Sequence, residues 1–360
     1  MRQFHPLKVV AKQAETADSV RIDLEVPETL QDTFAFLPGQ HLPIQLEKDG
    51  KRLRRTYSIC SAHGHWPLQI GVRVQPGGQF SAYTAESLSV GDSLDVMPPT
   101  GRFHADVDAN HAKFYLGVAA GSGITPVLSI IASLLEGEPN SRCALFYGNR
   151  KQGTTMFIED LYALKNRFPE RLQLHFVFSR EEQEFSISAG RIDADKMHEL
   201  LERLCDGVTI DEVFVCGPDT MIDAVEQAMI DRGLAAEKVH SERFGAPRLA
   251  ANKVSGDAAA DAPADADQSS VTVIMDGHKK SFVMSRGGSS IVDAAAANGI
   301  ELPYSCKGGV CATCRTHLRE GEANMANNYG LEPWEVEQGY VLACQSRPVS
   351  AKLTLDYDKS

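Results

Sequence analysis

Residues 303–314 read PYSCKGGVCATC, and a distant fourth cysteine opens the stretch CQSRP at 344–348. The spacing is Cys-x4-Cys-x2-Cys, then 29 residues, then Cys, which is typical of plant-type [2Fe-2S] sites. Thiolates are the soft ligands that iron-sulfur chemistry requires, and the paired glycines allow a tight loop whose backbone N–H groups can face the sulfurs. We therefore expect a [2Fe-2S] cluster held by Cys306, Cys311, Cys314 and Cys344.

Zinc binding and disulfide formation are weaker alternatives for these cysteines. Zinc sites usually combine two Cys-x-x-Cys pairs or mix cysteine with histidine, which does not match this spacing. Structural disulfides belong to secreted proteins, and the N-terminal residues MRQFHPLKVVAKQ contain no apolar signal segment. Three further cysteines are isolated from one another and are expected to be buried, inert thiols: Cys60, Cys143 and Cys205.

The bulk composition excludes several classes of protein. The chain has 360 residues, 43% of them apolar, a length that allows two or three domains. No run approaches the roughly 18 apolar residues of a membrane span. The net charge is -12 with no basic patch, so a nucleic-acid partner is not expected. These features predict a cytoplasmic protein.

A linker separates the cluster region from the rest of the chain. Residues 249–270 contain eight Ala and four Asp and no aromatic side chain, so they cannot bury enough surface to offset their ordering entropy. We therefore predict four segments, in order of residue number: 1–108, 109–248, the flexible linker 249–270, and 271–360.

The secondary-structure pattern changes along the chain. Five strand-like stretches separated by Pro, Gly and Asp clusters fill the first hundred residues and predict an antiparallel β-barrel. From about Lys113 strands alternate with helices, which predicts a parallel α/β domain. After the linker come two strands, a helix near 291–297, a long cysteine-bearing loop and a last strand at 351–357. We expect a β-grasp ferredoxin domain there, so the fold class is a multi-domain mixture of α+β and α/β.

A pair of motifs in the barrel suits a flavin. Arg55, Tyr57 and Ser58 lie in one strand, and Gly78 and Ser81 follow in a glycine turn that opens a helix. An Arg suits a pyrophosphate, an aromatic ring covers a flavin ring, a hydroxyl can bond a ring nitrogen, and a helix N-terminus favours phosphate. The first motif alone would be an ordinary edge strand with a surface Arg.

A second glycine-rich turn suits a pyridine nucleotide. Gly121, Gly123 and Thr125 follow an apolar strand, with Thr125 expected as N-cap and Pro126 as the first helical residue. Such a turn lets a pyrophosphate approach a helix N-terminus closely. The later sequence Cys216-Gly217-Pro218 ends the last predicted parallel strand, where open sheets place ligands. The alternative for Cys216 is a buried strand-end thiol.

These motifs resemble the ferredoxin-NADP reductase superfamily. The resemblance implies that Arg55 contacts the FAD pyrophosphate, Tyr57 packs on the isoalloxazine and Ser58 approaches its N5, while Gly78 and Ser81 hold the pyrophosphate. It also places Cys216, Gly217 and Pro218 beside the nicotinamide and returns Glu242 and Phe244 to the flavin. Those last two residues could instead mark a helix-to-linker junction. Ser58, Cys216 and Glu242 are thus the expected catalytic group.

The choice of nucleotide depends on two strand ends. Ser179 and Arg180 offer a hydroxyl and a guanidinium to a 2′-phosphate, and Arg150 ends the preceding strand, so NADPH is expected. Glu181 and Glu182 follow at once, and carboxylates turned inward would favour NADH.

The order of domains resembles that of oxygenase reductases. FLPGQHL, LRRTYSIC, LFYGNR and NYGLEPWEVEQGYVLACQS, in particular, resemble the reductase components of ring-1,2-phenylacetyl-CoA epoxidases. The resemblance implies electron transfer from NADPH through FAD to the cluster and on to a di-iron oxygenase in phenylacetate catabolism. A hydride carries two electrons and a [2Fe-2S] cluster accepts one, so a flavin between them is required. No Glu-x-x-His pair accompanies the motifs, which implies that the oxygenase is a separate protein.

Three alternatives stay open from the sequence. The first is the reductase of another ring hydroxylase or monooxygenase. The second is a stand-alone flavin oxidase or ferric reductase. The third is a redox-sensing module with a regulatory cluster.

Overall fold

The computed structural model describes residues 3–48, 51–244, 267–331 and 333–359. The chain divides into two compact units, one of residues Arg2–Phe244 and the other of residues Gly245–Ser360 together with Met1. Most of the predicted linker, residues 249–266, lies outside the described residues. A strand already begins at Gln268, so the last three residues assigned to the linker belong to the sheet.

The N-terminal part of the first unit is a six-stranded antiparallel sheet in the order β4-β3-β6-β1-β2-β5. A bridge between Ile59 and Ile70 joins the two outer strands, which closes the sheet into the expected barrel. Alternate residues of each strand face inward because side chains on a strand have a period of two. The elements are β1 (His5–Thr16), β2 (Ser19–Glu25), β3 (His41–Lys48), β4 (Lys51–Ser58), β5 (Leu68–Arg73), α1 (Gln79–Glu86) and β6 (Ser93–Val96).

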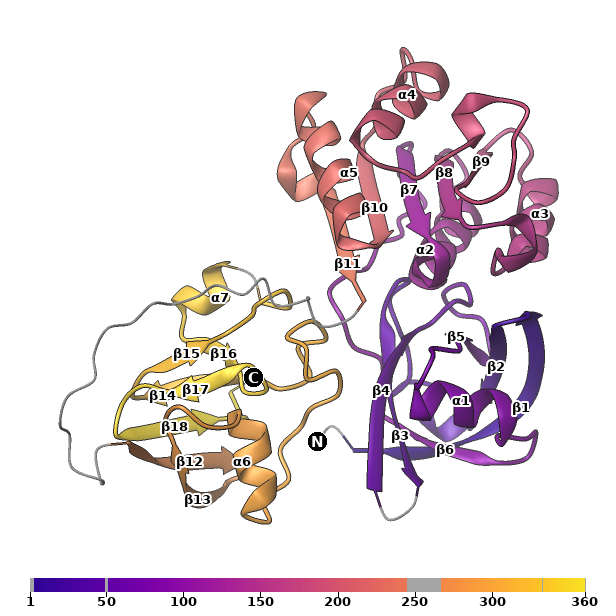
Figure 1. The fold of residues 1–360 in the computed structure, drawn as a ribbon. Coiled ribbons are helices and arrows are strands. Elements are labelled where there is room, and N and C mark those ends of the chain that lie inside the picture. The colour runs from indigo at the N-terminus through magenta and orange to yellow at the C-terminus, as the bar shows by residue number, and fades with distance from the viewer. Residues whose placement is uncertain (1–2, 49–50, 245–266, 332, 360) are drawn as a thin grey trace. The chain divides into compact units, whose positions relative to one another are not determined.

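The rest of this unit is a parallel sheet in the order β11-β10-β7-β8-β9, as predicted (Figure 1). Its strands are β7 (Phe114–Ala120), β8 (Arg142–Asn149), β9 (Leu172–Phe178), β10 (Glu212–Gly217) and β11 (Val239–Arg243). Its helices are α2 (Ile124–Gly137), α3 (Ile158–Arg167), α4 (Ala194–Leu204) and α5 (Asp219–Asp231). The helix α5 begins directly after Pro218, which cannot donate a hydrogen bond to a strand ladder and so ends β10.

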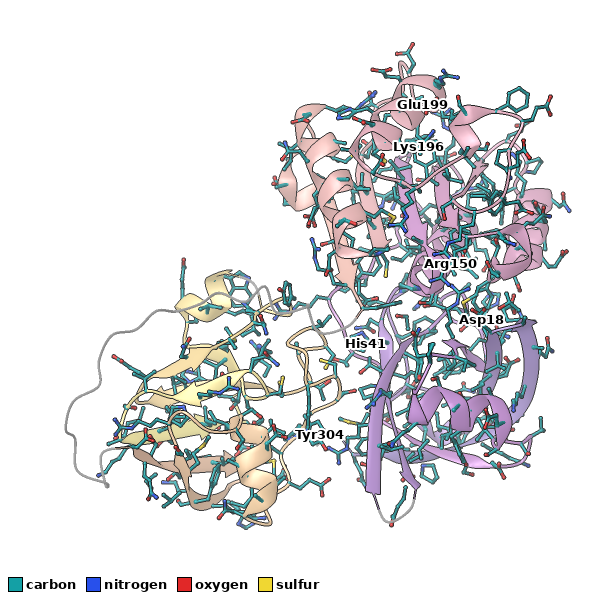
Figure 2. The ribbon with its side chains drawn as sticks, viewed as in Figure 1. Asp18, His41, Arg150, Lys196, Glu199 and Tyr304 are labelled. Atoms are coloured by element: carbon teal, nitrogen blue, oxygen red, sulfur yellow. The ribbon has the colours of Figure 1, made fainter. Side chains whose placement is uncertain are left out.

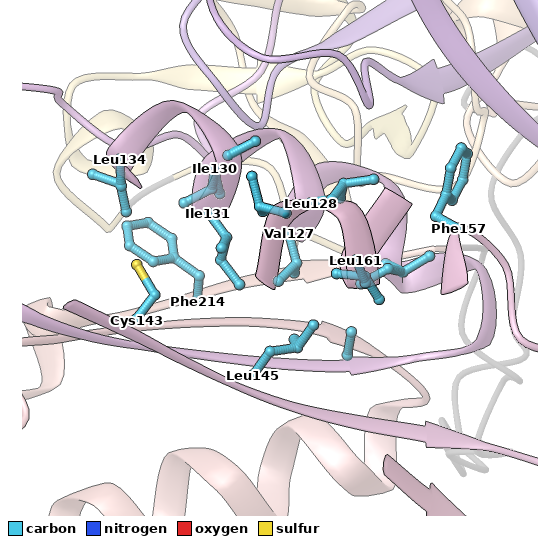
Figure 3. Close-up of a cluster of buried hydrophobic side chains, with 14 of the residues drawn as sticks. Val127, Leu128, Ile130, Ile131, Leu134, Cys143, Leu145, Phe157, Leu161 and Phe214 are labelled. Carbon is cyan, nitrogen blue, oxygen red and sulfur yellow. The ribbon is translucent and has the colours of Figure 1, made fainter. Parts of the chain in front are cut away.

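Both faces of this parallel sheet are buried. Tyr115 and Ala119 of β7 pack in one apolar cluster with α2 and α3, whereas Leu116 and Val118 pack in another with α4 and α5. Figure 3 shows the first cluster, in which Val127 and other residues of α2 lie over the sheet. The helix α2 is almost wholly buried, so the loop before it is held firmly.

The second unit has a mixed five-stranded sheet in the order β13-β12-β18-β14-β16, with a small β15-β17 pair. Apolar residues of α6 pack on this sheet, which is the expected β-grasp arrangement. The elements are β12 (Gln268–Met275), β13 (His278–Ser285), α6 (Ile291–Ala297), β14 (Arg315–Glu320), β15 (Ala323–Met325), α7 (Pro333–Glu337), β16 (Tyr340–Leu342), β17 (Ser346–Pro348) and β18 (Lys352–Asp356). The described residues of the predicted long loop therefore contain short strands and a one-turn helix. Within the described residues no helix is both long and apolar enough to cross a membrane.

Candidate redox site

The predicted flavin residues lie on β4 and at the start of α1. The Tyr57 ring is half-buried and packs against the Phe80 ring, with centroids 5.4 Å apart. Burial raises the pKa of the Tyr57 hydroxyl, so this ring stays neutral and suits an apolar ring face. Arg55 is exposed, and its guanidinium donates to the carbonyl of Arg54, 2.7 Å away. The guanidinium is thus held at the surface of the barrel.

The glycine turn before α1 is closed by a serine hydroxyl. Ser81 Oγ accepts a hydrogen bond from the Gln75 amide at 3.1 Å and donates to the Gly78 carbonyl at 3.3 Å. A Cβ on Gly78 would lie 2.5 Å from that hydroxyl oxygen, so the turn has room only for glycine there. The residue pattern fits a flavin pyrophosphate at the N-terminus of α1, and this role for Gly78 and Ser81 stays a prediction.

The nucleotide loop corrects one sequence-based detail. Gly121–Gly123 form a 3-10 turn that runs directly into α2 at Ile124, so Thr125 lies inside the first turn and is not the N-cap. Gly121 adopts a φ of 55°, a left-handed conformation that glycine tolerates, and the 3-10 turn that follows β7 here takes the place of a side-chain N-cap. The Thr125 hydroxyl instead donates to the Ser122 carbonyl at 3.0 Å.

The loop also fits tightly against the end of β10. A Cβ on Gly123 would overlap the backbone carbonyl of Cys216, so only glycine permits this close approach. On the other side, the buried Tyr147 hydroxyl donates to the Gly121 carbonyl at 2.9 Å. The loop is therefore fixed between β10 and the end of β8.

Three predicted catalytic residues from separate strands meet in one buried place. Ser58 Oγ donates to Glu242 Oε2 at 3.3 Å, although the two residues are 184 positions apart in the chain. Cys216 of β10 pairs in register with Glu242 of β11. His41, at the start of β3, contacts Glu242 Oε1 through Nδ1 at 3.3 Å. Figure 2 labels His41 in the barrel. Because Glu242 lies in a strand, the alternative of a helix-to-linker junction is wrong.

Electrostatics keep the Cys216 thiol protonated. The side chain is fully buried, and burial together with the negative charge of Glu242 raises the pKa of the thiol well above its usual value. A neutral thiol is a poor nucleophile, so covalent catalysis by Cys216 is disfavoured. The residue instead forms part of the wall beside the nucleotide loop.

The remaining nucleotide residues lie at the carboxyl ends of β8 and β9. The Arg180 amide donates to the Arg150 carbonyl at 2.9 Å, which brings these two exposed arginines side by side, with Ser179 next to them. Figure 2 labels Arg150 at this edge of the sheet. The Glu181 carboxylate is engaged elsewhere, because it accepts from the Gln152 amide at 2.6 Å. Glu181, one of the two carboxylates that would repel a phosphate, is therefore bound to the turn at Gln152.

Three further predicted residues lie at the ends of β10 and β11, next to Cys216 and Glu242. A Cβ on Gly217 would lie 2.5 Å from the side chain of Met221, so β10 turns closely over α5. Pro218 is exposed and immediately precedes that helix. Phe244 follows β11, and 47% of its surface is exposed. The contact of Phe244 with a flavin stays a prediction.

The cysteine loop of the second unit turns its backbone toward sulfur, as expected. The Gly308 amide donates to Cys306 Sγ at 3.3 Å, and the Cys311 amide donates to the same sulfur at 3.5 Å. Lys307, with φ 53°, and Gly309, with φ 78°, take left-handed conformations that fold the loop around this sulfur. The amides of the loop thus stabilise negative charge on the Cys306 sulfur by themselves.

The four cysteines form two thiol pairs. Cys311 donates to Cys306 and so lowers the pKa of Cys306 to about 5, against the effect of burial. Cys314 likewise donates to Cys344 and lowers its pKa. Two pairs suit a cluster with two irons and four cysteine ligands.

Sequence reasoning missed several residues that hold these sites. His41 belongs to FLPGQHL, where a lone histidine at a strand start was the available signal, but its partner Glu242 is distant in sequence. Tyr147 lies in the stretch LFYGNR, but nothing in that pattern indicated that its hydroxyl would hold the nucleotide loop. Gln345 follows Cys344 directly and contacts the cysteine loop.

Family models match all three predicted domains. An oxidoreductase FAD-binding domain matches residues 6–105, an oxidoreductase NAD-binding domain matches 118–227, and a 2Fe-2S iron-sulfur cluster binding domain matches 273–349. These matches agree with the barrel, the parallel sheet and the β-grasp unit respectively.

Characterised proteins resemble the chain over nearly its whole length. A subunit of the 1,2-phenylacetyl-CoA epoxidase of Escherichia coli strain K12 is 40% identical, and the match covers 99% of each chain. The ferredoxin reductase component of a 3-ketosteroid-9-alpha-monooxygenase from Rhodococcus rhodochrous is 34% identical over 98% of this chain and 96% of its own. Among solved structures, a phthalate dioxygenase reductase superposes with a TM-score of 0.59 at 25% identity, covering 98% of both chains.

The shared domains and their order establish the cofactors and the direction of electron flow. The FAD-binding, NAD-binding and [2Fe-2S] domains occur together in relatives that are reductase components of oxygenases. The chain therefore belongs to the ferredoxin-NADP reductase superfamily as an oxygenase-type reductase, and it transfers electrons from NAD(P)H through FAD to a C-terminal [2Fe-2S] cluster.

Proposed function

We propose that this reductase uses NADPH and supplies electrons to the di-iron oxygenase component of a phenylacetyl-CoA epoxidase. The observation that carries the proposal is the 40% identity to a subunit of such an epoxidase, which extends over 99% of both chains and is not confined to the cofactor motifs. A cytoplasmic location is part of this proposal.

Residues of the barrel position the flavin ring, and residues of the parallel sheet position the nicotinamide ring beside it. When bound, FAD accepts two electrons as hydride and releases them singly, and the cluster carries one at a time. Tyr57 covers the flavin ring while Arg55, Gly78 and Ser81 hold its pyrophosphate. Gly121, Gly123 and Thr125 seat the nucleotide, with Gly217, Pro218 and Phe244 lining the space beside it.

Ser58, Glu242 and Cys216 orient the reacting centre. The Ser58 hydroxyl is held by Glu242 at 3.3 Å, which fixes the direction in which its oxygen can meet a ring nitrogen. Cys216 presents a neutral, buried thiol that excludes water from the nicotinamide side. Exclusion of water protects a hydride transfer from competing reactions.

The cysteine loop supplies the ligands for the cluster. Cys306, whose pKa is lowered to about 5, provides a charged ligand at neutral pH, and the pKa of Cys344 is lowered as well. Cys311 and Cys314 would give up their protons on binding iron. The backbone amides around Cys306 then offset the accumulated negative charge.

Arg180→Ala tests the preference for NADPH. The guanidinium stands beside Ser179 and Arg150 at an exposed strand end where only NADPH presents an additional phosphate. Loss of a charge-assisted hydrogen bond should raise the KM for NADPH about tenfold or more, while the KM for NADH stays within about twofold. Steady-state reduction of ferricyanide with each nucleotide measures both values.

Arg203→Ala is the matched control for that experiment. Arg203 is an exposed arginine of α4 that pairs with Glu199 at 3.5 Å. It should change neither KM. Equal effects of Arg180→Ala on NADPH and NADH would contradict the proposed phosphate contact.

The identity of the oxygenase is tested by reconstitution. Purified epoxidase oxygenase subunits should consume NADPH with this reductase only when phenylacetyl-CoA is added, and epoxide should form in proportion. The second candidate, a reductase of another monooxygenase, draws on the 34% identity to the ketosteroid relative. Coupled turnover with a ketosteroid monooxygenase and none with the epoxidase would favour that candidate.

A further inference from the structure

Gln345 connects three segments around the cysteine pairs. Its Nε2 donates to the Lys307 carbonyl at 2.7 Å, and its Oε1 accepts from Asn327 Nδ2 at 3.0 Å. The side chain is almost fully buried, since the exposed fraction of the residue is 8%. The side-chain amide of Gln345 thus connects Lys307 of the cysteine loop to Asn327, and it does so from the position next to Cys344.

The second proton of this amide is directed at Cys344. Nε2 lies 3.3 Å from the Cys344 carbonyl oxygen and 3.8 Å from Cys344 Sγ, so these two acceptors share it. A hydrogen bond to a thiolate stabilises negative charge on the sulfur. Gln345 is therefore a side-chain amide donor to a ligand sulfur, in addition to the backbone amides that donate to the Cys306 sulfur.

The contact with Lys307 supports an unfavourable backbone conformation. Lys307 has a φ of 53°, which is costly for a residue with a Cβ, and the following amide of Gly308 points at Cys306 Sγ. By holding the Lys307 carbonyl, Gln345 keeps the loop in the shape that directs this amide. The packing is tight, because a Cβ on Gly309 would lie 3.0 Å from Gln345 Cγ and 2.9 Å from the Asn327 carbonyl oxygen.

We propose that Gln345 is a positioning residue for the [2Fe-2S] cluster, which controls both how firmly the cluster is retained and its reduction potential. This role rests on the proposed ligand set Cys306, Cys311, Cys314 and Cys344. Outer hydrogen bonds to ligands influence metal affinity, and hydrogen bonds to sulfur influence cluster potentials.

Gln345→Leu tests both effects, with Gln338→Leu as the matched control. Gln338 is an exposed glutamine of the same unit. In the full-length protein, Gln345→Leu should lose its visible cluster absorbance to EDTA about tenfold faster than wild type. The cluster should also become harder to reduce in a spectroelectrochemical titration, by about a tenfold change in the one-electron equilibrium, or about 59 mV. The flavin potential should stay unchanged and serves as an internal reference.

Asn327→Ala separates positioning from the direct bond to sulfur. It removes the partner of Oε1 and leaves Nε2 in place, so cluster loss should accelerate while the potential moves less than in Gln345→Leu. If Gln345→Leu assembles no cluster, this second variant still decides. The inference is overturned if both variants keep their clusters as long as Gln338→Leu does. If Gln345→Leu is colourless, the same result for Asn327→Ala alone overturns it.

The assignment of the four cysteines as cluster ligands is tested by separate results. A wild-type protein without iron, or Cys344→Ser with an unchanged cluster spectrum, would refute the ligand set. A normal wild-type spectrum with an unaffected Gln345→Leu would refute the role of Gln345 alone.

Discussion

Cys311→Ser is expected to abolish the visible absorbance of the cluster and to lower NADPH-dependent reduction of cytochrome c by more than about 100-fold. The reason is that a serine hydroxyl is a hard, protonated group where iron needs a soft thiolate. Reduction of ferricyanide by NADPH should remain within about twofold of wild type, because FAD and NAD(P)H bind to the separate Arg2–Phe244 unit. Spectra, iron content and the two acceptor assays on the full-length variant measure these outcomes.

The control for this experiment is Cys205→Ala. Cys205 is fully buried at the end of α4, and burial raises the pKa of its thiol, so it is an inert packing residue. This variant should keep the cluster and both activities. If Cys311→Ser lost ferricyanide and cytochrome reduction together, the two units would not work as separable electron carriers.

The sequence predicts most of the fold because its strong elements carry their own signals. The helix Ile291–Ala297 has a serine N-cap and an alanine-rich run, and it begins and ends where predicted. The parallel strands are continuous apolar runs followed by glycine or helix signals. In these segments the local sequence pattern agrees with the tertiary structure, so the pattern alone is enough to locate them.

The cysteine-bearing loop was predicted less well for a physical reason. The strands β15 and β17 have three residues each, too few to show a period of two. Their pairing, such as Asn324 with Arg347, joins residues on either side of α7. Such structure depends on long-range contacts and on the hydrogen bonds of Gln345, which no local pattern encodes.

The motifs of the candidate site were predicted, and the grouping of Ser58, Cys216 and Glu242 was expected from the family resemblance, but the contact of His41 with Glu242 was not. The cysteine spacing and the glycine turns lie within short stretches, so their chemistry is readable from the sequence. The meeting of Ser58, His41 and Glu242 requires β3 and β4 of the barrel to reach β11, which lies 184 residues beyond Ser58 and 201 beyond His41. His41 was missed for that reason, and the position of Thr125 was wrong because the 3-10 turn before α2 replaces a side-chain cap.

Gly123→Ala should have the second large effect, on hydride transfer from the nucleotide. Gly123 has a φ of -62°, which alanine accepts readily, so backbone strain plays no part. The added methyl group, however, would overlap the Cys216 carbonyl and lie 3.1 Å from the Gly217 amide nitrogen, which are backbone atoms that cannot rotate away. The start of α2 must move away from β10, and this displaces the nucleotide loop and the Cys216 wall together.

A displacement of about 1 Å at a reacting centre can reduce a rate about 100-fold. Stopped-flow reduction of the flavin by NADPH and by NADH should therefore slow by about that factor in Gly123→Ala, equally for both nucleotides, in contrast to Arg180→Ala. Dithionite should still reduce the flavin and the cluster fully, because it delivers electrons without binding to the nucleotide loop. Gly153→Ala is the matched control, since nothing lies within 4 Å of its added Cβ. Wild-type flavin reduction by Gly123→Ala would mean that the close approach of α2 to β10 does not position the nucleotide.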